Sequence, residues 1–162
     1  MLQNINFVAK NKVTKLEELI DAVGLTGYES HHPHNESSGF RFRISLARAL
    51  ANDPDFILLD DPFRRMNSET KDETYELLRR VLGKFEVAFI LATTNISEAI
   101  YLSNKIYLMK KNPGEIIEEI TLDAEILKTK GLNRQERFIS LRNEIEKSFM
   151  ASGEMSQTEI RI

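Results

Sequence analysis

The sequence predicts an α/β fold in which a helical subdomain is followed by an incomplete parallel sheet with helices and a C-terminal β-hairpin. Three observations support this prediction. Short unbroken apolar runs at residues 56–59 and 87–92 are typical of strands that a parallel sheet buries on both faces. Apolar residues recur at helical spacing before, between and after these runs. Two strand-like segments flank KKNPGE at residues 110–115, which is the pattern of a hairpin.

The N-terminal third is predicted to contain two helices joined by a loop. The first helix spans residues 12–23, and Gly24 follows it as a stop signal. Residues 25–39 are polar and have no apolar period, so we expect a surface loop. The second helix begins at Phe40 and ends before Asp53 and Pro54. Its apolar face is Phe40, Ile44, Ala47 and Ala51, and we expect Arg41, Arg43 and Arg48 to face water or a partner.

Further helices follow each predicted strand. Thr70 with Glu73 three positions later predicts a capping box, after which a helix runs to about Phe85. Asn95 and Glu98 are expected to cap a short helix that ends near Leu102. A charged C-terminal helix keeps a narrow apolar seam, which favours packing against a core, and a loose tail is expected from residue 151. The seam consists of Phe138, Leu141, Ile145 and Phe149.

The composition is that of a globular chain with one core. The 162 residues are 41% hydrophobic and 29% charged, with a formal net charge of -3, so no massed basic surface favours nucleic acid. The absence of cysteine excludes disulfides and thiolate zinc sites and is compatible with a reducing compartment. The longest apolar run, residues 87–92, is far shorter than the roughly 20 residues of a spanning helix. We therefore expect a soluble, cytoplasmic chain.

A candidate anion site lies where the predicted loop meets the second helix. Ser37, Ser38 and Gly39 offer backbone N–H groups, hydroxyls and the positive end of a helix dipole, which together suit a phosphate. An ordinary helix N-cap is the alternative interpretation of an isolated Ser-Ser-Gly. The nearby His31, His32 and His34 lack a carboxylate or cysteine at ligand spacing, so we expect adventitious metal binding there at most.

Two aspartates stand at the carboxyl end of the strand at residues 56–59. Open α/β sheets bind ligands at this end, and a carboxylate such as Asp60 can hold Mg²⁺ through water. The alternative is that Asp60 and Asp61 form a solvated turn before Pro62.

These motifs, taken in order, resemble the C-terminal half of an ABC transporter ATP-binding subunit of the nitrate, sulfonate and taurine importer type. The resemblance covers about residues 12–120 and rests on YESHHPHNESSGFRFRISLARALANDPDFILLDDPF, ILATTNISEAIYLSNKIYLM and NPGEIIEEI. It implies a partial P-loop NTPase fold. The implied parts are a helical subdomain at 1–54, the C-terminal part of the ATPase sheet at 55–125, a C-terminal helix at 126–150 and a flexible tail at 151–162.

The resemblance also implies roles for single residues. Ser37, Ser38 and Gly39 occupy the signature loop, which in the family contacts ATP held mainly by the opposing subunit. Asp60 matches the Walker B aspartate, whose ligand is Mg²⁺. Asp61 stands in place of the usual catalytic glutamate, and Thr94 stands in place of the switch histidine. Aspartate is one methylene shorter than glutamate and threonine has no imidazole, so we expect weak catalysis through these two positions.

The sequence departs from the family pattern in several further places. Ser38 replaces a glycine, Glu36 places a carboxylate beside the anion site, and RRMN at 64–67 replaces small residues and an aspartate. No G-x-x-x-x-G-K-[ST] occurs among the 162 residues, so no phosphate loop is present. We therefore expect this chain alone to hydrolyse no ATP at a useful rate. We expect its ATP and Mg²⁺ to be bound only in a larger assembly.

Three hypotheses about function follow. The first is a truncated or degenerate ATP-binding subunit of an importer, peripheral at the inner face of the membrane when assembled with a permease. Its partners would be a second ATP-binding chain or the missing N-terminal half, and strand edges left unpaired by a missing strand could also join two copies. The second is a non-catalytic interaction or regulatory module derived from the same fold, which the substitutions at Glu36, Ser38, Asp61 and Thr94 favour. A free-standing phosphate-ligand enzyme, the third, lacks a phosphate cradle and a nucleophile.

Overall fold

The computed structural model describes residue 5 and residues 13–30, 37–122 and 132–151. The chain divides into two compact units, Met1–Ala92 and Thr93–Ile162. The boundaries expected after residues 54 and 125 stay predictions. No described helix is long and apolar enough to cross a membrane.

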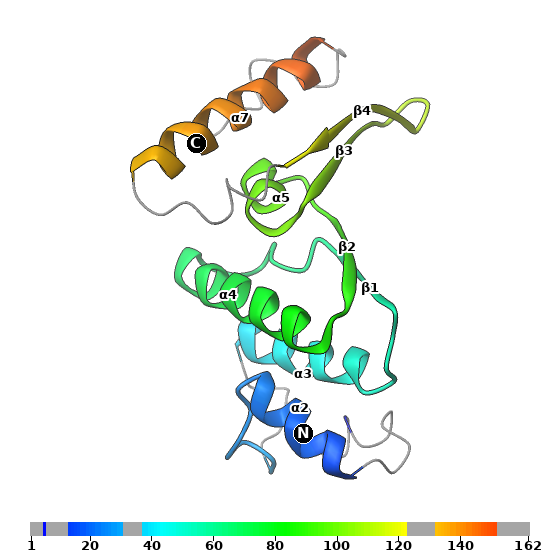
Figure 1. The fold of residues 1–162 in the computed structure, drawn as a ribbon, viewed down its shortest axis with the longest axis vertical. Coiled ribbons are helices and arrows are strands. Elements are labelled where there is room, and N and C mark those ends of the chain that lie inside the picture. Colours follow the sequence, from blue (N-terminus) through cyan, green and yellow to red (C-terminus); the bar gives the residue numbers. More distant parts are fainter. Residues whose placement is uncertain (1–4, 6–12, 31–36, 123–131, 152–162) are drawn as a thin grey trace. The chain divides into compact units, whose positions relative to one another are not determined.

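In the described part of the first unit, helices α2, α3 and α4 accompany a two-stranded parallel sheet (Figure 1). Its elements are α2 (Val13–Ala22), α3 (Ser38–Leu50), β1 (Phe56–Asp60), α4 (Ser68–Phe85) and β2 (Ala88–Ala92). Helix α3 contacts both α2 and α4. Strands β1 and β2 pair in parallel from Phe56 with Ala88 to Asp60 with Ala92. Helix α4 connects the two strands, as a parallel pair requires.

Phe63, which follows β1, is fully buried in the core of this unit. Its ring centroid lies 5.6 Å from that of Phe42 on α3 and 4.9 Å from that of Tyr75 on α4. These aromatic contacts fix the turn after β1 against two helices. This turn carries residues of the candidate functional site, so its packing decides where those residues lie.

Helix α2 is held to the rest of the unit by two arginines. Arg43 of α3 donates from Nη1 to the carbonyl oxygen of Val23 at 2.8 Å, and Arg80 of α4 donates from Nη2 to that of Ala22 at 3.3 Å. Both satisfy carbonyls that the C-terminus of a helix leaves without a partner. The expectation that Arg43 faces water or a partner is therefore wrong, whereas Arg41 and Arg48 are exposed as expected. The buried face of α3 is also wider than predicted and includes Phe42, Leu46 and Leu50.

In its described residues, the second unit packs helices α5 and α7 with a hairpin. Its elements are α5 (Ile96–Leu102), β3 (Lys105–Lys110), β4 (Glu115–Thr121) and α7 (Leu132–Ala151). Strands β3 and β4 pair antiparallel, with a bulge between Leu108 and Met109. The core contains Ile100, Ile106, Leu108, Leu122 and Ile145, and the predicted seam of α7 packs against it. The hairpin, the C-terminal helix and the role of its seam are thus confirmed.

The two strands of the first unit are not buried on both faces. Ile57 is buried, but Phe56, Leu58 and Ile90 are 56%, 68% and 61% exposed. The apolar runs correctly predicted parallel strands, but nothing in the described part of the chain covers their second face. β1–β2 and β3–β4 are separate two-stranded sheets.

Helix α4 begins three residues earlier than the predicted capping box. Its N-cap is Asn67, whose Oδ1 accepts a hydrogen bond from the backbone N–H of Thr70 at 2.9 Å. Thr70 therefore lies inside the first turn. Asparagine is as good an N-cap as threonine or better, so the sequence contained two start signals and the structure uses the first.

Candidate functional site

The start of helix α3 carries two of the predicted anion-site residues in different roles. Ser37 is the N-cap, and its Oγ accepts a hydrogen bond from the N–H of Phe40 at 3.2 Å. Ser38 begins the helix and donates from Oγ to the carbonyl oxygen of Arg65 at 3.3 Å. This hydrogen bond joins the start of α3 to the turn after β1. Glu36 and the three histidines lie outside the described residues.

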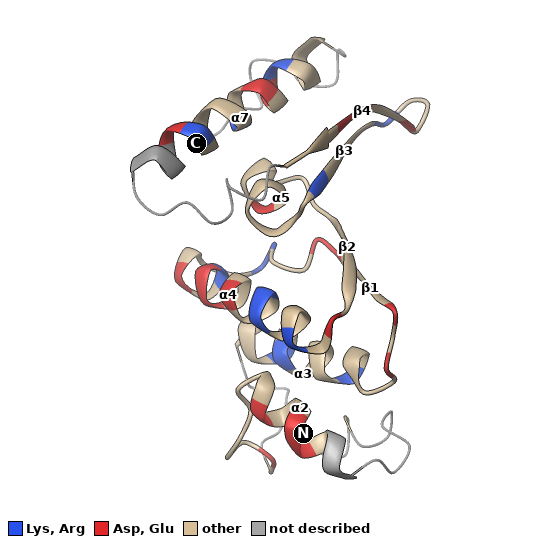
Figure 2. Cartoon of the chain, viewed as in Figure 1, with Lys and Arg blue, Asp and Glu red and all other residues tan. Residues whose placement is uncertain are grey.

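An open depression of about 540 Å³ lies where this helix end meets the turn. Its lining consists of Ser38, Arg41, Asp61, Pro62, Arg64 and Arg65. The three arginines and the positive end of α3 give it an electrostatic preference for anions, and Asp61 is the acidic group in this lining. Basic positions recur along α3, which has no acidic residue (Figure 2).

The two aspartates after β1 occupy different environments. Asp61 adopts a left-handed φ of 40°, and its N–H donates to the carbonyl oxygen of Ala92 at 2.8 Å. Its carboxylate lies 3.9 Å from Nε of Arg64 and lines the depression. Asp60 is exposed at the carboxyl end of β1, in register with Ala92. Of the two aspartates, therefore, only Asp61 lines the depression together with Ser38.

Gly39 is buried and faces helix α4. A Cβ at this position would lie 2.8 Å from Cγ2 of Thr70, so the close approach of α3 to α4 requires glycine. The structure thus gives Gly39 a packing role, and its proposed contact with a ligand stays a prediction. No group of three or more His, Asp or Glu side chains able to hold a metal is found in the described segments, and Asp60 as a Mg²⁺ ligand also stays a prediction.

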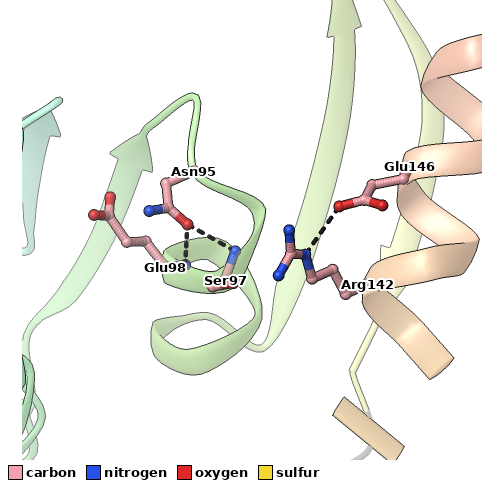
Figure 3. A network of polar contacts seen from close by, with 5 residues as sticks. All are labelled: Asn95, Ser97, Glu98, Arg142 and Glu146. Carbon is pink, nitrogen blue, oxygen red and sulfur yellow. Dashed lines mark hydrogen bonds and ion pairs between the residues drawn. The ribbon is translucent and has the colours of Figure 1, made fainter. Parts of the chain in front are cut away.

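Thr94 belongs to the second unit, where it precedes α5 and is exposed. The residues beside it form a tight polar network. Oγ1 of Thr93 donates to Oε2 of Glu98 at 2.7 Å and accepts from the N–H of Asn95 at 3.1 Å. Oδ1 of Asn95 accepts from the backbone N–H groups of Ser97 and Glu98, as Figure 3 shows. Asn95 as a cap is confirmed, and Glu98 is buried.

The comparisons with known proteins agree on one family. The family model described as "ABC transporter" matches residues 1–64. The aliphatic sulfonates import ATP-binding protein SsuB of Bacillus thuringiensis subsp. konkukian is 34% identical over 146 residues, which are 90% of this chain and 57% of that protein. This chain belongs to the ABC transporter ATP-binding proteins.

Other relatives of this ABC protein cover a similar region. The taurine import ATP-binding protein TauB of Yersinia pestis is 32% identical, over 84% of this chain and 55% of its own length. An uncharacterized ABC transporter ATP-binding protein of Methanocaldococcus jannaschii is 31% identical, over 77% of this chain and 49% of its own. The chain thus spans about half the length of the curated relatives it matches.

Solved ABC structures show the same fold. A dimeric ATP-binding cassette in a post-hydrolysis state, bound to ADP and Pi, matches with a TM-score of 0.55 at 27% identity. The match covers 71% of this chain and 49% of that one. The predicted α/β class, as part of an ABC ATPase cassette, is therefore confirmed.

Two sets of residues in this ABC protein have positions that the sequence did not predict. Arg64 and Arg65 line the depression, whereas the sequence pattern indicates only that they depart from the family; two adjacent arginines after a strand end are a usable signal for an anion site. Glu98 was interpreted as a capping residue. Its burial depends on tertiary packing, whereas its bond to Thr93 joins residues only five positions apart in the sequence.

Proposed function

We propose that this chain is a truncated or degenerate ATP-binding subunit of an ABC-type importer, which couples nucleotide binding to solute transport only with a complementary half or a partner subunit. The observation that carries the proposal is the basic depression at the start of α3, formed by Ser38, Arg41 and the arginines after β1. The names of the sulfonate and taurine relatives support the importer class. In an assembled importer the chain would lie at the inner face of the membrane, against a permease.

ATP would be shared between this chain and another. Arg41, Arg64 and Arg65 would attract its phosphates, and the N-terminal backbone N–H groups of α3 would bind them. Asp60 lies outside the depression and would hold the Mg²⁺ of a second nucleotide, since exposed carboxylates at the carboxyl end of parallel strands suit this ion. Bound Mg-ATP would supply the phosphoanhydride bond that the complete assembly would hydrolyse. Asp61 and Thr94 take the places of the family's catalytic glutamate and switch histidine, and each would act less effectively than the residue that it replaces.

A non-catalytic interaction or regulatory module is the second candidate. The ion pair of Asp61 with Arg64 favours it, because the carboxylate that would orient water already contacts a neighbouring side chain. The engagement of the Ser38 hydroxyl by the Arg65 carbonyl also favours it.

Nucleotide binding distinguishes the two candidates. We expect a fluorescent ATP analogue with Mg²⁺ to show no micromolar binding to the chain alone. We expect binding when the chain is coexpressed with the region of the sulfonate relative that lies outside the matched residues. Arg64→Glu should then weaken binding by about tenfold or more, since charge-assisted hydrogen bonds contribute about 1.5–3 kcal/mol. Arg48→Glu, on the same helix as Arg41 but outside the depression, is the control.

Absence of nucleotide binding in the coexpressed sample would contradict the ATP-binding proposal and favour the interaction module. Micromolar binding by the chain alone would contradict both candidates. The intact mass of the endogenous protein would show whether the complementary half is part of the same polypeptide.

A further inference from the structure

The turn that follows β1 presents two adjacent arginines from a fixed backbone. Phe63 is fully buried and Met66 is only 8% exposed, so the side chains on either side of the arginines are anchored in the core. The N–H of Met66 donates to the carbonyl oxygen of Phe63 at 3.0 Å, which closes the turn. Between these anchors, Arg64 and Arg65 are exposed and line the depression beside α3. We call residues 63–66 the arginine turn.

The arginine turn is joined to α3 without the use of either guanidinium. Oγ of Ser38 donates to the main-chain carbonyl oxygen of Arg65, so the side chain of Arg65 takes no part in this bond. No ion pair within the described part of the chain involves that side chain. Arg64 differs, because its Nε lies 3.9 Å from the carboxylate of Asp61. The charge of Arg65 is therefore less compensated than that of Arg64.

The lining of the depression indicates which anion would bind there. Its described residues include three arginines and one aspartate, which leave a net charge of +2. Each guanidinium can bind phosphate oxygens through two parallel hydrogen bonds, so three of them suit several linked phosphates better than a single one. Sites for drug-sized ligands with an aromatic ring are lined mainly by apolar and aromatic side chains, whereas Pro62 is the apolar residue among the described lining residues.

We propose that the depression is a site for inorganic polyphosphate, which this protein binds without a nucleoside and without a second subunit. Arg41 and Arg65 bind the phosphates, and Arg64 mainly offsets the charge of Asp61. The small residues that the family has in place of Arg64 and Arg65 could not supply this charge. The inference rests on the proposed function in taking the phosphate class of ligand from it, but it requires no partner.

The test titrates sodium tripolyphosphate into the isotopically labelled, full 162-residue protein at low ionic strength and follows the amide signals by NMR. We expect a dissociation constant of roughly 0.1–1 mM, because exposed charges contribute little each. The signals that move should belong to the start of α3 and to the arginine turn. ATP should bind within about threefold of tripolyphosphate, and orthophosphate about tenfold more weakly, since it engages fewer guanidiniums.

Charge variants test the roles of the lining residues. Arg65→Gln should weaken tripolyphosphate binding about fivefold, because it removes the less compensated charge. Asp61→Asn should strengthen binding about threefold, because it removes the carboxylate that repels the ligand. The combination of both should bind nearly as the wild type does, since the net charge of the lining is then restored. Arg48→Gln, on α3 but outside the depression, is the matched control and should change nothing.

Folding is checked separately. Arg65→Gln keeps the main-chain carbonyl that Ser38 contacts, so circular dichroism and the thermal midpoint should be nearly those of the wild type. The inference is overturned if tripolyphosphate does not bind, if the shifted signals lie elsewhere, or if Arg48→Gln weakens binding as much as Arg65→Gln. Binding of ATP that is tighter than that of tripolyphosphate by about tenfold or more would also overturn it, because a nucleoside would then be recognised.

The inference and the proposed function can fail independently. Tripolyphosphate binding by the protein alone, with no binding of the ATP analogue by the coexpressed complex, would support the polyphosphate site and contradict the ATP-binding proposal. Binding of the analogue by the complex, with no tripolyphosphate binding by the protein alone, would do the reverse.

Discussion

Gly39 shows how one residue of a binding motif can be required for packing. A Cβ there would approach Cγ2 of Thr70 to 2.8 Å, and Thr70 is part of helix α4. We expect Gly39→Ala to destabilise the first unit by about 1–3 kcal/mol, because overpacking forces neighbouring side chains or helices apart. Chemical denaturation followed by circular dichroism measures the change.

Two variants make this prediction specific. Gly83 lies within α4, and a Cβ added there would meet no atom within 4 Å, so Gly83→Ala should stabilise by roughly 0.5–1 kcal/mol through helix propensity. Adding Thr70→Ser to Gly39→Ala removes the obstructing methyl group and should recover part of the lost stability. A Gly39→Ala protein as stable as wild type would show that α3 and α4 are not closely packed at this point.

At the scale of elements, the attachment of α2 depends on Arg43. Its guanidinium donates to the carbonyl oxygen of Val23, the residue after the end of α2. We expect Arg43→Met to cost about 1–2 kcal/mol of unfolding free energy, because the partly buried carbonyl would lose its donor. Arg48→Met, an exposed change on the same helix, should stay within about 0.5 kcal/mol. Equal effects of the two variants in urea titrations would contradict a role for Arg43 in holding α2.

The β3–β4 hairpin makes a prediction about pH. Nζ of Lys105 lies 2.5 Å from Oε1 of Glu119, and this hydrogen bond lowers the pKa of Glu119 and raises the pKa of Lys105. A carboxylate with a lowered folded pKa stabilises the hairpin above its unfolded pKa, and the effect is lost as pH falls through the folded value. The lysine contribution is present below its unfolded pKa and is lost as pH rises through its raised folded value.

NMR titration of the Glu119 carboxyl carbon tests this pairing. Lys105→Gln should move the pKa of Glu119 back toward that of an unfolded peptide. Lys110→Gln removes a different ion pair of the hairpin, to Glu115, and should leave the pKa of Glu119 unchanged. A pKa of Glu119 that is insensitive to Lys105→Gln would mean that the two side chains do not pair in solution.

At the scale of the whole molecule, the substitutions at Asp61 and Thr94 would limit turnover in a completed assembly. If they do, Asp61→Glu together with Thr94→His should raise ATP hydrolysis by on the order of tenfold or more, because glutamate reaches further toward water and histidine adds an imidazole. Phosphate release from the coexpressed complex measures the rate. Asp60→Asn in the same background should abolish the gain. An unchanged rate would mean that the other departures from the family pattern, such as Ser38, also prevent turnover.

The sequence by itself determined the helices, the strands and the hairpin, because these depend on hydrogen bonds and apolar periods within short stretches. It also placed Ser37 at a helix start and Asn95 at a cap, since capping is local. Only the tertiary structure decided that Asp61 lines the same depression as Ser38 while Asp60 is exposed at the end of β1, and that Arg43 holds α2. Likewise, an apolar run specifies a strand but not whether anything covers its second face. Whether that face is covered depends on residues distant in sequence, or on another polypeptide. For this reason the apolar runs predict burial of Leu58 and Ile90, whereas the structure exposes both.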